Sequence, residues 1–168
     1  MIAALPLLSL GGFYQFGYVT RNLDAALVTL RDTFGITRVR RKHSSPTMES
    51  LHAWVGTTMI EVLQLSEGAP QMYFDYLPET VGELRLQHLG YRVATLADWD
   101  ELNAAAARLG LAVPLYADMM EGQLKACYFD TRALLGHYTE FVYLAGAMAG
   151  MYDDVPQNMP LAMTGNAL

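Results

Sequence analysis

The feature that most constrains the fold is an internal repeat. Phe16-Gly17-Tyr18 recurs as Leu89-Gly90-Tyr91, and Phe34-Gly35-Ile36 recurs at almost the same offset as Leu109-Gly110-Leu111. Self-similarity at a nearly constant spacing is typical of chains built from copies of one supersecondary unit. The sequence therefore predicts two copies of the same unit.

Each copy contains a helical stretch followed by a change to strand periodicity. Helices are predicted over 23–30 and 98–109, because Asn22 and Asp98 are residue types that cap helix starts, and Gly35 and Gly110 stand where helices usually stop. After each helix, apolar residues recur at about every second position, which indicates strands. One strand precedes each helix, and the following strands are predicted over 36–40, 49–55, 58–65, 111–116, 123–129 and 137–144.

The predicted fold class is α+β, with two βαβββ modules that form a shared, cup-shaped curved sheet. One module alone would leave a face of its sheet uncovered, so two must close around a common interior. The predicted boundaries are an N-terminal tail (1–12), a first module (13–66), a linker with a short helical piece at 73–77 (67–84), a second module (85–144) and a C-terminal extension (145–168).

Composition narrows the classes of protein that this chain can form. It has 168 residues, 52% of them hydrophobic, which suits a packed core rather than a disordered chain. A net charge of −6 argues against nucleic-acid binding, and the single cysteine, Cys127, excludes an internal disulfide framework. No apolar run reaches the ~20 residues that span a membrane, and the N-terminus lacks the basic start of a secretory signal. We expect a cytoplasmic protein without nucleic-acid or membrane partners, whose apolar N-terminal tail contacts a second copy in a homodimer.

Four polar residues interrupt strands that are otherwise apolar. Gln15 corresponds to His88, and Glu61 corresponds to Glu140, so each pair occupies equivalent places in the repeat. A carboxylate in an apolar strand is unfavourable unless its charge is compensated, and neither glutamate has a Lys or Arg next to it in sequence. Two explanations stay open: the four residues hold a cation, or they are hydrogen-bonded core residues and outward-pointing carboxylates.

The order of these motifs resembles the vicinal oxygen chelate superfamily, which includes glyoxalase I, methylmalonyl-CoA epimerase, extradiol dioxygenases and bleomycin-resistance proteins. The segments that carry the resemblance are 13–19 with 22–26, 60–62, 88–93 and 136–141. The resemblance implies that the family's four metal positions fall on Gln15, Glu61, His88 and Glu140. This ligand set is most similar to that of glyoxalase I. The epimerase pattern has His at the first position and an amide at the second, and an extradiol dioxygenase needs two His, so oxygen activation is disfavoured.

The resemblance implies a divalent ion, with Zn²⁺, Ni²⁺, Co²⁺ and Mn²⁺ all compatible with the ligand set. Such an ion beside a substrate carbonyl makes the adjacent C–H more acidic. Glu140 is the expected base and Glu61 the expected partner on the other face. The leading prediction is therefore a glyoxalase-like isomerase or lyase acting on a small molecule or thioester. The alternatives are an acyl-CoA epimerase and a metal-free protein of the bleomycin-resistance type that binds a small molecule.

Predicted substrate contacts are less specific. Trp54 and His52 share a strand face, and Tyr128 and Tyr138 are placed to line the enclosed space, although the three aromatic residues also suit an ordinary core. His52 suits a group that supports a metal ligand or orients the substrate, but equally a partly exposed strand histidine. Arg38 belongs to the dense basic stretch 37–43, which suits the carboxylates of glutathione or the phosphates of coenzyme A, but equally a charged edge strand. Glutathione-binding segments are not recognisable ahead of His88.

Overall fold

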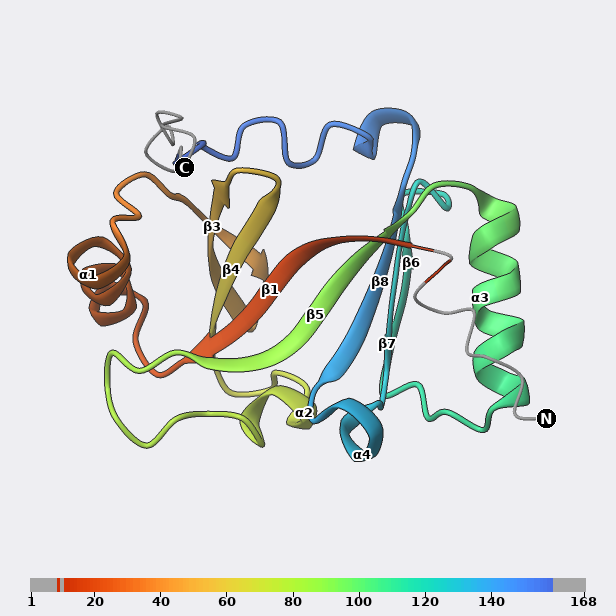
Figure 1. The fold of residues 1–168 in the computed structure, drawn as a ribbon, viewed down its shortest axis with the longest axis horizontal. Coiled ribbons are helices and arrows are strands. Elements are labelled where there is room, and N and C mark those ends of the chain that lie inside the picture. The colour runs from red at the N-terminus through yellow and green to blue at the C-terminus, as the bar shows by residue number, and fades with distance from the viewer. Residues whose placement is uncertain (1–8, 10, 159–168) are drawn as a thin grey trace, which may run out of the picture.

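The computed structural model describes residues 9 and 11–158, and these form one eight-stranded mixed sheet flanked by helices (Figure 1). The spatial order is β2-β3-β4-β1-β5-β8-β7-β6. The first half contains β1 (Gly12–Thr20), α1 (Leu23–Phe34), β2 (Arg40–Ser45), β3 (Met48–Val55) and β4 (Thr58–Leu65). The second contains β5 (Arg85–Val93), α3 (Leu96–Arg108), β6 (Leu115–Met119), β7 (Leu124–Phe129) and β8 (Tyr138–Leu144). The predicted α+β class with a curled, shared sheet is confirmed.

The sheet is arranged symmetrically about its central pair of strands. β1 and β5 run antiparallel to each other at the centre, and each is flanked by the last strand of its own half in parallel, β4 beside β1 and β8 beside β5. Each half then continues outward with antiparallel strands. The centre of this arrangement lies at Phe16 and Leu89, which are equivalent residues of the repeat and are paired across β1 and β5.

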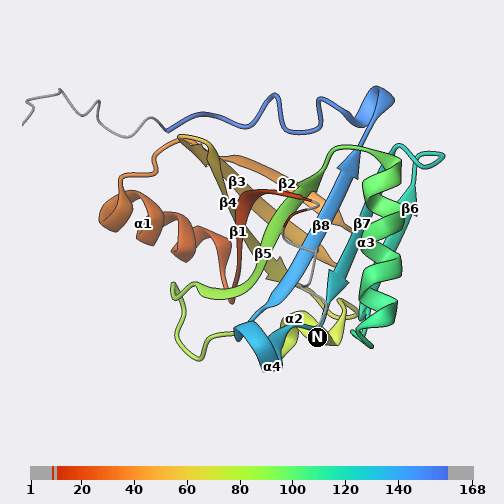
Figure 2. The same cartoon turned by 45° about the vertical axis from the view of Figure 1, so that its right-hand side comes forward.

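The two long helices cover the outer face of the sheet, one on each half (Figures 1 and 2). The buried face of α1 packs on apolar side chains of β3 and β4, including Leu51, Ala53 and Val62. α3 packs Trp99 and Leu102 against Cys127, Phe129 and Phe141. Burial of these apolar faces stabilises the helices far more than their intrinsic propensity does. The opposite face of the sheet is left for the interior of the cup.

The helix ends explain where the predicted boundaries were wrong. Asn22 caps α1 as expected, accepting a 2.8 Å hydrogen bond from the Ala25 amide, but α3 starts two residues before Asp98, and its cap is Thr95. The strands predicted to start at residues 36 and 111 start later, because these residues still form the hydrogen bonds that end the preceding helix. The Ile36 amide donates to the Leu30 carbonyl, and the Leu111 amide donates to the Ala106 carbonyl, both at 3.0 Å. The strands begin only at Arg40 and Leu115.

The segments between and after the modules are short and mostly irregular. The predicted helical piece at 73–77 is α2 (Gln71–Phe74), which starts two residues earlier, and α4 (Arg132–Leu135) precedes β8. No helix among the described residues is long and apolar enough to cross a membrane. Most of the predicted N-terminal tail (1–8 and 10) and residues 159–168 of the predicted extension lie outside the described residues.

Residues 145–158 form a strap that runs from β8 back to the first half of the molecule, along the top of Figure 1. It starts with a 3₁₀ turn (Gly146–Met148) and packs Tyr152 and Val155 against Tyr14 and Met59. Asn158 fixes its far end, because its side-chain oxygen accepts from the Thr37 and Arg38 amides at 3.0 Å. The strap therefore connects the two halves at one end of the cup.

Candidate functional site

Gln15 and His88 meet at the centre of the sheet because each lies opposite a glycine. Across the antiparallel β1–β5 pair, Gln15 is in register with Gly90 and Gly17 is in register with His88. A β-carbon on Gly17 would lie 1.9–2.3 Å from three atoms of the His88 ring, and one on Gly90 would lie 2.9 Å from the Gln15 β-carbon. The glycines of the repeated Gly-Tyr motif therefore provide the space in which the polar side chain of the other half sits.

The two glutamates reach the same centre from the flanking strands. Glu61 in β4 is in register with Gly17, and Glu140 in β8 is in register with Gly90. The Glu61 Oε2 atom accepts a 2.6 Å hydrogen bond from Gln15 Nε2 and lies 3.3 Å from His88 Nε2. Glu140 Oε2 lies 3.5 Å from the same His88 nitrogen. The structure thus brings the four predicted metal positions together. All four side chains are buried, and each half of the chain contributes one carboxylate.

Two further side chains hold this group in place. His52 Nε2 lies 2.9 Å from Glu61 Oε1, so His52 positions the carboxylate rather than standing alone on the cavity wall. Gln87 Oε1 lies 2.6 Å from His88 Nδ1 and fixes the orientation of the imidazole ring.

Gln87 is adjacent to His88, and neighbours in a regular strand point to opposite faces. A shift in the β1–β5 register at Gln87, and a second at Tyr14, places an extra residue directly before each central polar residue. Tyr14 and Gln87 are therefore equivalent positions of the repeat, like Gln15 and His88. Sequence reasoning missed Gln87, because bulges are features of strand pairing that alternation along one strand does not reveal.

The electrostatics of the two carboxylates differ. Burial would raise the pKa of Glu61, but hydrogen bonds and charges from His52 and His88 together outweigh it and hold that pKa well below its usual range. Burial raises the pKa of Glu140 to about 7, with the charge of Glu61 adding to the rise and that of His88 opposing it. Burial opposes protonation of His88, yet its hydrogen bond to Glu61 and both carboxylate charges raise its pKa. One carboxylate is thus stabilised as the anion and the other is biased toward the protonated form.

The donor chemistry of the four side chains fits a divalent cation, although their present rotamers are bonded to one another. Gln15 Oε1 and Glu140 Oε2 are buried and have no hydrogen-bond partner, which leaves two oxygen acceptors without a donor in this group of side chains. Among residues 9 and 11–158, however, no three His, Cys, Asp or Glu side chains stand in a ready ion-binding arrangement. A flip of the Gln15 amide would exchange its donor nitrogen for the acceptor oxygen. Gln15, Glu61, His88 and Glu140 are therefore the residues that would hold the ion.

A cavity of about 380 Å³ opens onto this group from inside the cup. Of the predicted substrate contacts, His52 and Tyr128 line it, together with Glu61 and Glu140. The other three are not among its lining residues. Trp54 packs beside Tyr14 and Tyr152, and Tyr138 is buried in a cluster with Tyr73. Arg38 is exposed, just ahead of β2, where its backbone bonds to Asn158.

The cavity wall includes residues that the sequence analysis did not single out. Tyr152, from the strap, lines the cavity, and its ring centroid lies 5.9 Å from that of His52. Lys42 lines it from β2. If the start of β2 at Arg40 had been known, strand alternation would have placed Lys42 on the same face as Arg40 and indicated it as a lining residue. Tyr152 carries no such indication, because the strap has no regular periodicity.

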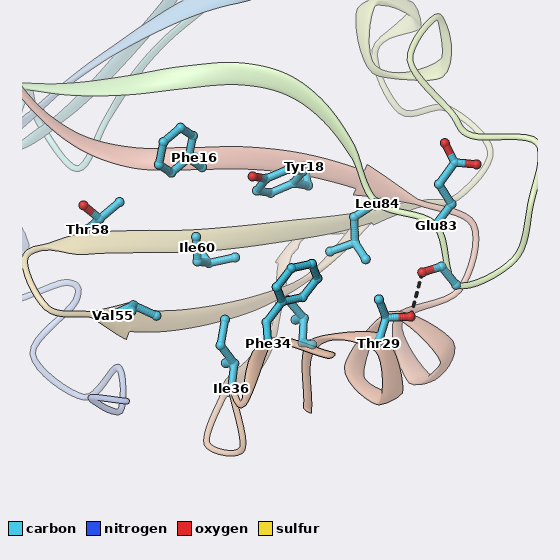
Figure 3. Close-up of a pocket in the computed structure, with 12 residues that line it drawn as sticks. Phe16, Tyr18, Thr29, Phe34, Ile36, Val55, Thr58, Ile60, Glu83 and Leu84 are labelled. Atoms are coloured by element: carbon cyan, nitrogen blue, oxygen red, sulfur yellow. Dashed lines mark hydrogen bonds between the residues drawn. The ribbon is translucent and has the colours of Figure 1, made fainter. Parts of the chain in front are cut away.

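A larger cavity, of about 700 Å³, lies on the opposite side of the same strands (Figure 3). Phe16, Tyr18 and Ile60 alternate along β1 and β4 with the central polar residues and point away from them, toward α1. Among the described residues that line this cavity, Glu83, near its loop end, is the one titratable group besides Tyr18. The smaller cavity holds the acid–base groups, so we place the candidate active site there.

Comparison with known proteins identifies the fold. No family model matches the sequence, and no curated protein matches it. Among solved structures, the methylmalonyl-CoA epimerase from Mycobacterium tuberculosis superposes with a TM-score of 0.62 at 17% identity, covering 89% of this chain and 97% of its own. That of Streptomyces coelicolor, in complex with 2-nitronate-propionyl-CoA, gives 0.58 at 16% identity, covering 82% and 99%. A hypothetical protein from Bacillus halodurans gives 0.59 at 15%, covering 81% and 96%.

These similarities and the duplicated, curled sheet define the vicinal oxygen chelate fold. At these identities the comparison shows the fold alone. The similarity specific to glyoxalase I, suggested by the ligand pattern, stays a prediction.

Proposed function

We propose that this protein is a divalent-metal-dependent isomerase that removes and returns a proton on a carbon next to a carbonyl, with epimerisation of an acyl thioester as its favoured form. The observation that carries the proposal is the symmetric placement of Glu61 and Glu140. They occupy equivalent register positions on β4 and β8 and approach His88 Nε2 to 3.3 and 3.5 Å. An epimerase needs two proton-transfer groups facing opposite sides of one carbon, and the placement of one glutamate in each half supports this role for Glu61 and Glu140.

The ion, the two glutamates and His52 have different roles in the proposed reaction. When bound, the divalent ion supplies electrophilic stabilisation of charge on the substrate carbonyl oxygen. One glutamate takes the proton from the carbon and the other returns a proton to the opposite face, with the roles exchanged in the reverse direction. His52 fixes the Glu61 carboxylate through its 2.9 Å contact. Burial of the carboxylates, both less than a tenth exposed, limits competition from water.

Structural similarity supports the thioester form over the glyoxalase-type reaction. Of the three solved structures compared above, two are methylmalonyl-CoA epimerases, and one of these was solved with 2-nitronate-propionyl-CoA. The ligand pattern, with Gln15 at the first position and Glu61 at the second, supports the glyoxalase-like alternative. The shared step in both is removal of a proton next to a carbonyl.

The decisive experiment is metal-dependent exchange of the substrate α-proton with deuterated solvent. Protein loaded in turn with Zn²⁺, Ni²⁺, Co²⁺ or Mn²⁺ is incubated in D₂O with chiral acyl thioesters, hemithioacetals and α-hydroxyketones, and exchange is followed by NMR. Exchange accompanied by racemisation of a thioester supports the epimerase, whereas conversion of a hemithioacetal supports the glyoxalase-like alternative. Absence of exchange from the whole panel, combined with tight binding of an unreacted compound, would favour the metal-free binding protein.

A further inference from the structure

Strand β2 turns two cationic side chains toward the interior of the cup. Along this strand, Arg40 and Lys42 are half-buried, while Arg41 and His43 are exposed. Arg41 points outward, where it pairs with Asp24 and with Glu49, the latter at 2.7 Å. The basic stretch is therefore split by strand alternation into a solvated face and an interior face.

The two interior cations have different partners. Arg40 pairs with Asp154 and donates a 2.8 Å hydrogen bond to the Met151 carbonyl, so it is engaged with the strap. Two more of its nitrogens, Nε and Nη2, are buried without a hydrogen-bond partner. Lys42 lines the cavity, and no carboxylate of the described residues lies within ion-pair distance of its ammonium.

The surroundings of Lys42 disfavour an unpaired positive charge, and a bound anion would compensate it. Burial lowers the pKa of Lys42, and the neighbouring charge of Arg40 lowers it further, against the weaker opposing charges of Glu61 and Asp154. The chain carries 17 acidic residues against 11 Lys and Arg, so carboxylates were available to neutralise Lys42. On the outward face of the same strand, Arg41 has two such partners. The structure pairs the solvated cation and leaves the cavity cation for an external group.

The strand register fixes where Lys42 stands relative to the proton-transfer groups. Arg40 is in register with His52, which is in register with Glu61. Lys42 is one side-chain repeat further along, opposite Ser50. Lys42 and Glu61 are separated by two strand spacings across the sheet and by two residues along the strand, so their backbones lie about 12 Å apart. The Lys42 side chain therefore enters the cavity from a backbone position that is remote from the proton-transfer groups.

We propose that Lys42 binds an anionic group of the substrate that is remote from the reacting carbon. The inference rests on the proposed function and narrows its substrate class to acyl thioesters with a distant carboxylate or phosphate, as opposed to a carboxylate on the reacting carbon itself. Ser44 and Ser45 line the same cavity, where their hydroxyl groups already bond to Ser50 and Thr47, so Lys42 is the cationic group that the cavity wall offers to an anion. Lys42 is thus a specificity-determining residue and takes no part in proton transfer.

Matched thioesters of N-acetylcysteamine, a carrier without phosphate, test the proposal. The glutaryl and pentanoyl thioesters have the same chain length and differ in a terminal carboxylate. Wild-type protein is expected to bind the glutaryl thioester at least about tenfold more tightly, as for other charge-assisted contacts. Lys42→Gln abolishes this preference and leaves the pentanoyl affinity unchanged, and Lys42→Arg retains most of it. Arg41→Gln removes a charge from the outward face of the same strand and keeps the preference. Binding is measured by titration calorimetry, and melting temperatures show that each variant is folded.

Two further arms distinguish the sources of the anion. If Lys42 instead binds a carrier phosphate, Lys42→Gln weakens pentanoyl-CoA but neither N-acetylcysteamine thioester. The malonyl thioester, with its carboxylate on the reacting carbon, is expected to bind equally to wild type and Lys42→Gln. The inference is overturned if the wild type binds the glutaryl and pentanoyl thioesters equally and Lys42→Gln also leaves pentanoyl-CoA binding unchanged. A uniform loss of affinity for all compounds in Lys42→Gln overturns it as well. Because binding is read without turnover, lack of proton exchange would refute the proposed function while leaving the Lys42 result intact.

Discussion

At the scale of single residues, the site depends on the absence of side chains as much as on their presence. The Gly-Tyr repeat is visible in the sequence, and so are the four polar residues. What the sequence does not contain is the reciprocal pairing, Gln15 against Gly90 and His88 against Gly17, because register between β1 and β5 is a long-range property. The sequence shows that Gly17 and Gly90 recur, but only the structure shows that they leave room for His88 and Gln15.

Gly17→Ala is expected to displace His88. The added β-carbon would lie 1.9 Å from a ring atom, so either the imidazole or strand β1 must move. Overpacking of this kind costs about 3 kcal/mol of unfolding free energy, at the upper end of the usual range. Gly12→Ala is the matched control in the same strand, because its β-carbon would meet nothing within 4 Å. Urea denaturation measures both variants, and an unchanged midpoint for Gly17→Ala would contradict the packing described for His88.

Cys127 is expected to be inert in the folded protein. It is fully buried beneath α3, and burial, with a contribution from the Glu140 charge, raises its pKa to about 12. At pH 8 the thiolate fraction is then about 10⁻⁴, so a disulfide reagent should modify the single thiol only when the protein unfolds. Reaction rates with and without urea check this. Modification of the native protein at the rate of a free cysteine would show that the sheet opens locally far more readily than this packing allows.

At the scale of elements, periodicity predicted the helices and strands better than their boundaries. The first strand after each helix was placed too early, because Ile36 and Leu111 continue the apolar pattern while their amides complete the helix stop. The same error led to the prediction for Arg38. A strand starting at residue 36 would have put Arg38 on the same face as Arg40, whereas Arg38 lies before β2. With β2 starting at Arg40, the interior cations are Arg40 and Lys42.

The strap is expected to depend on its terminal anchor. Asn158 accepts two 3.0 Å hydrogen bonds from the Thr37 and Arg38 amides and donates one of 2.8 Å to the Arg38 carbonyl. Asn158→Ala should lower the unfolding free energy by about 1–2 kcal/mol. It should also accelerate amide hydrogen exchange in 150–157, where Tyr152 packs over the site. Gln157→Ala, which removes one hydrogen bond to the Gly56 carbonyl, should have a much smaller effect. Equal exchange rates in the two variants would show that apolar packing of Val155, not the anchor, holds the strap.

At the scale of the whole molecule, the duplication places one glutamate and one further polar side chain from each half around a single centre. Neither half contains a site alone. A bound cation would therefore connect β1 and β4 of the first half to β5 and β8 of the second. Such an ion binds the folded chain but not the separated halves of an unfolded one, so its affinity adds to the stability of the entire sheet.

A divalent cation is therefore expected to raise the melting temperature, and ligand changes in either half should abolish the rise. At a hundredfold excess over its dissociation constant, an ion adds about 2.7 kcal/mol, which corresponds to roughly 5–10 °C for a domain of this size. Gln15→Ala in β1 and Glu140→Ala in β8 remove one donor from each half, and both should lose the increment, because the ion needs ligands from both. Glu67→Gln, an exposed carboxylate outside the site, is the control and should keep the full rise. Thermal unfolding with and without Zn²⁺, Ni²⁺, Co²⁺ or Mn²⁺ gives the result. A rise that survives in both ligand variants would place the ion elsewhere, whereas loss in only one would mean that a single half binds it and that the two copies do not share a centre.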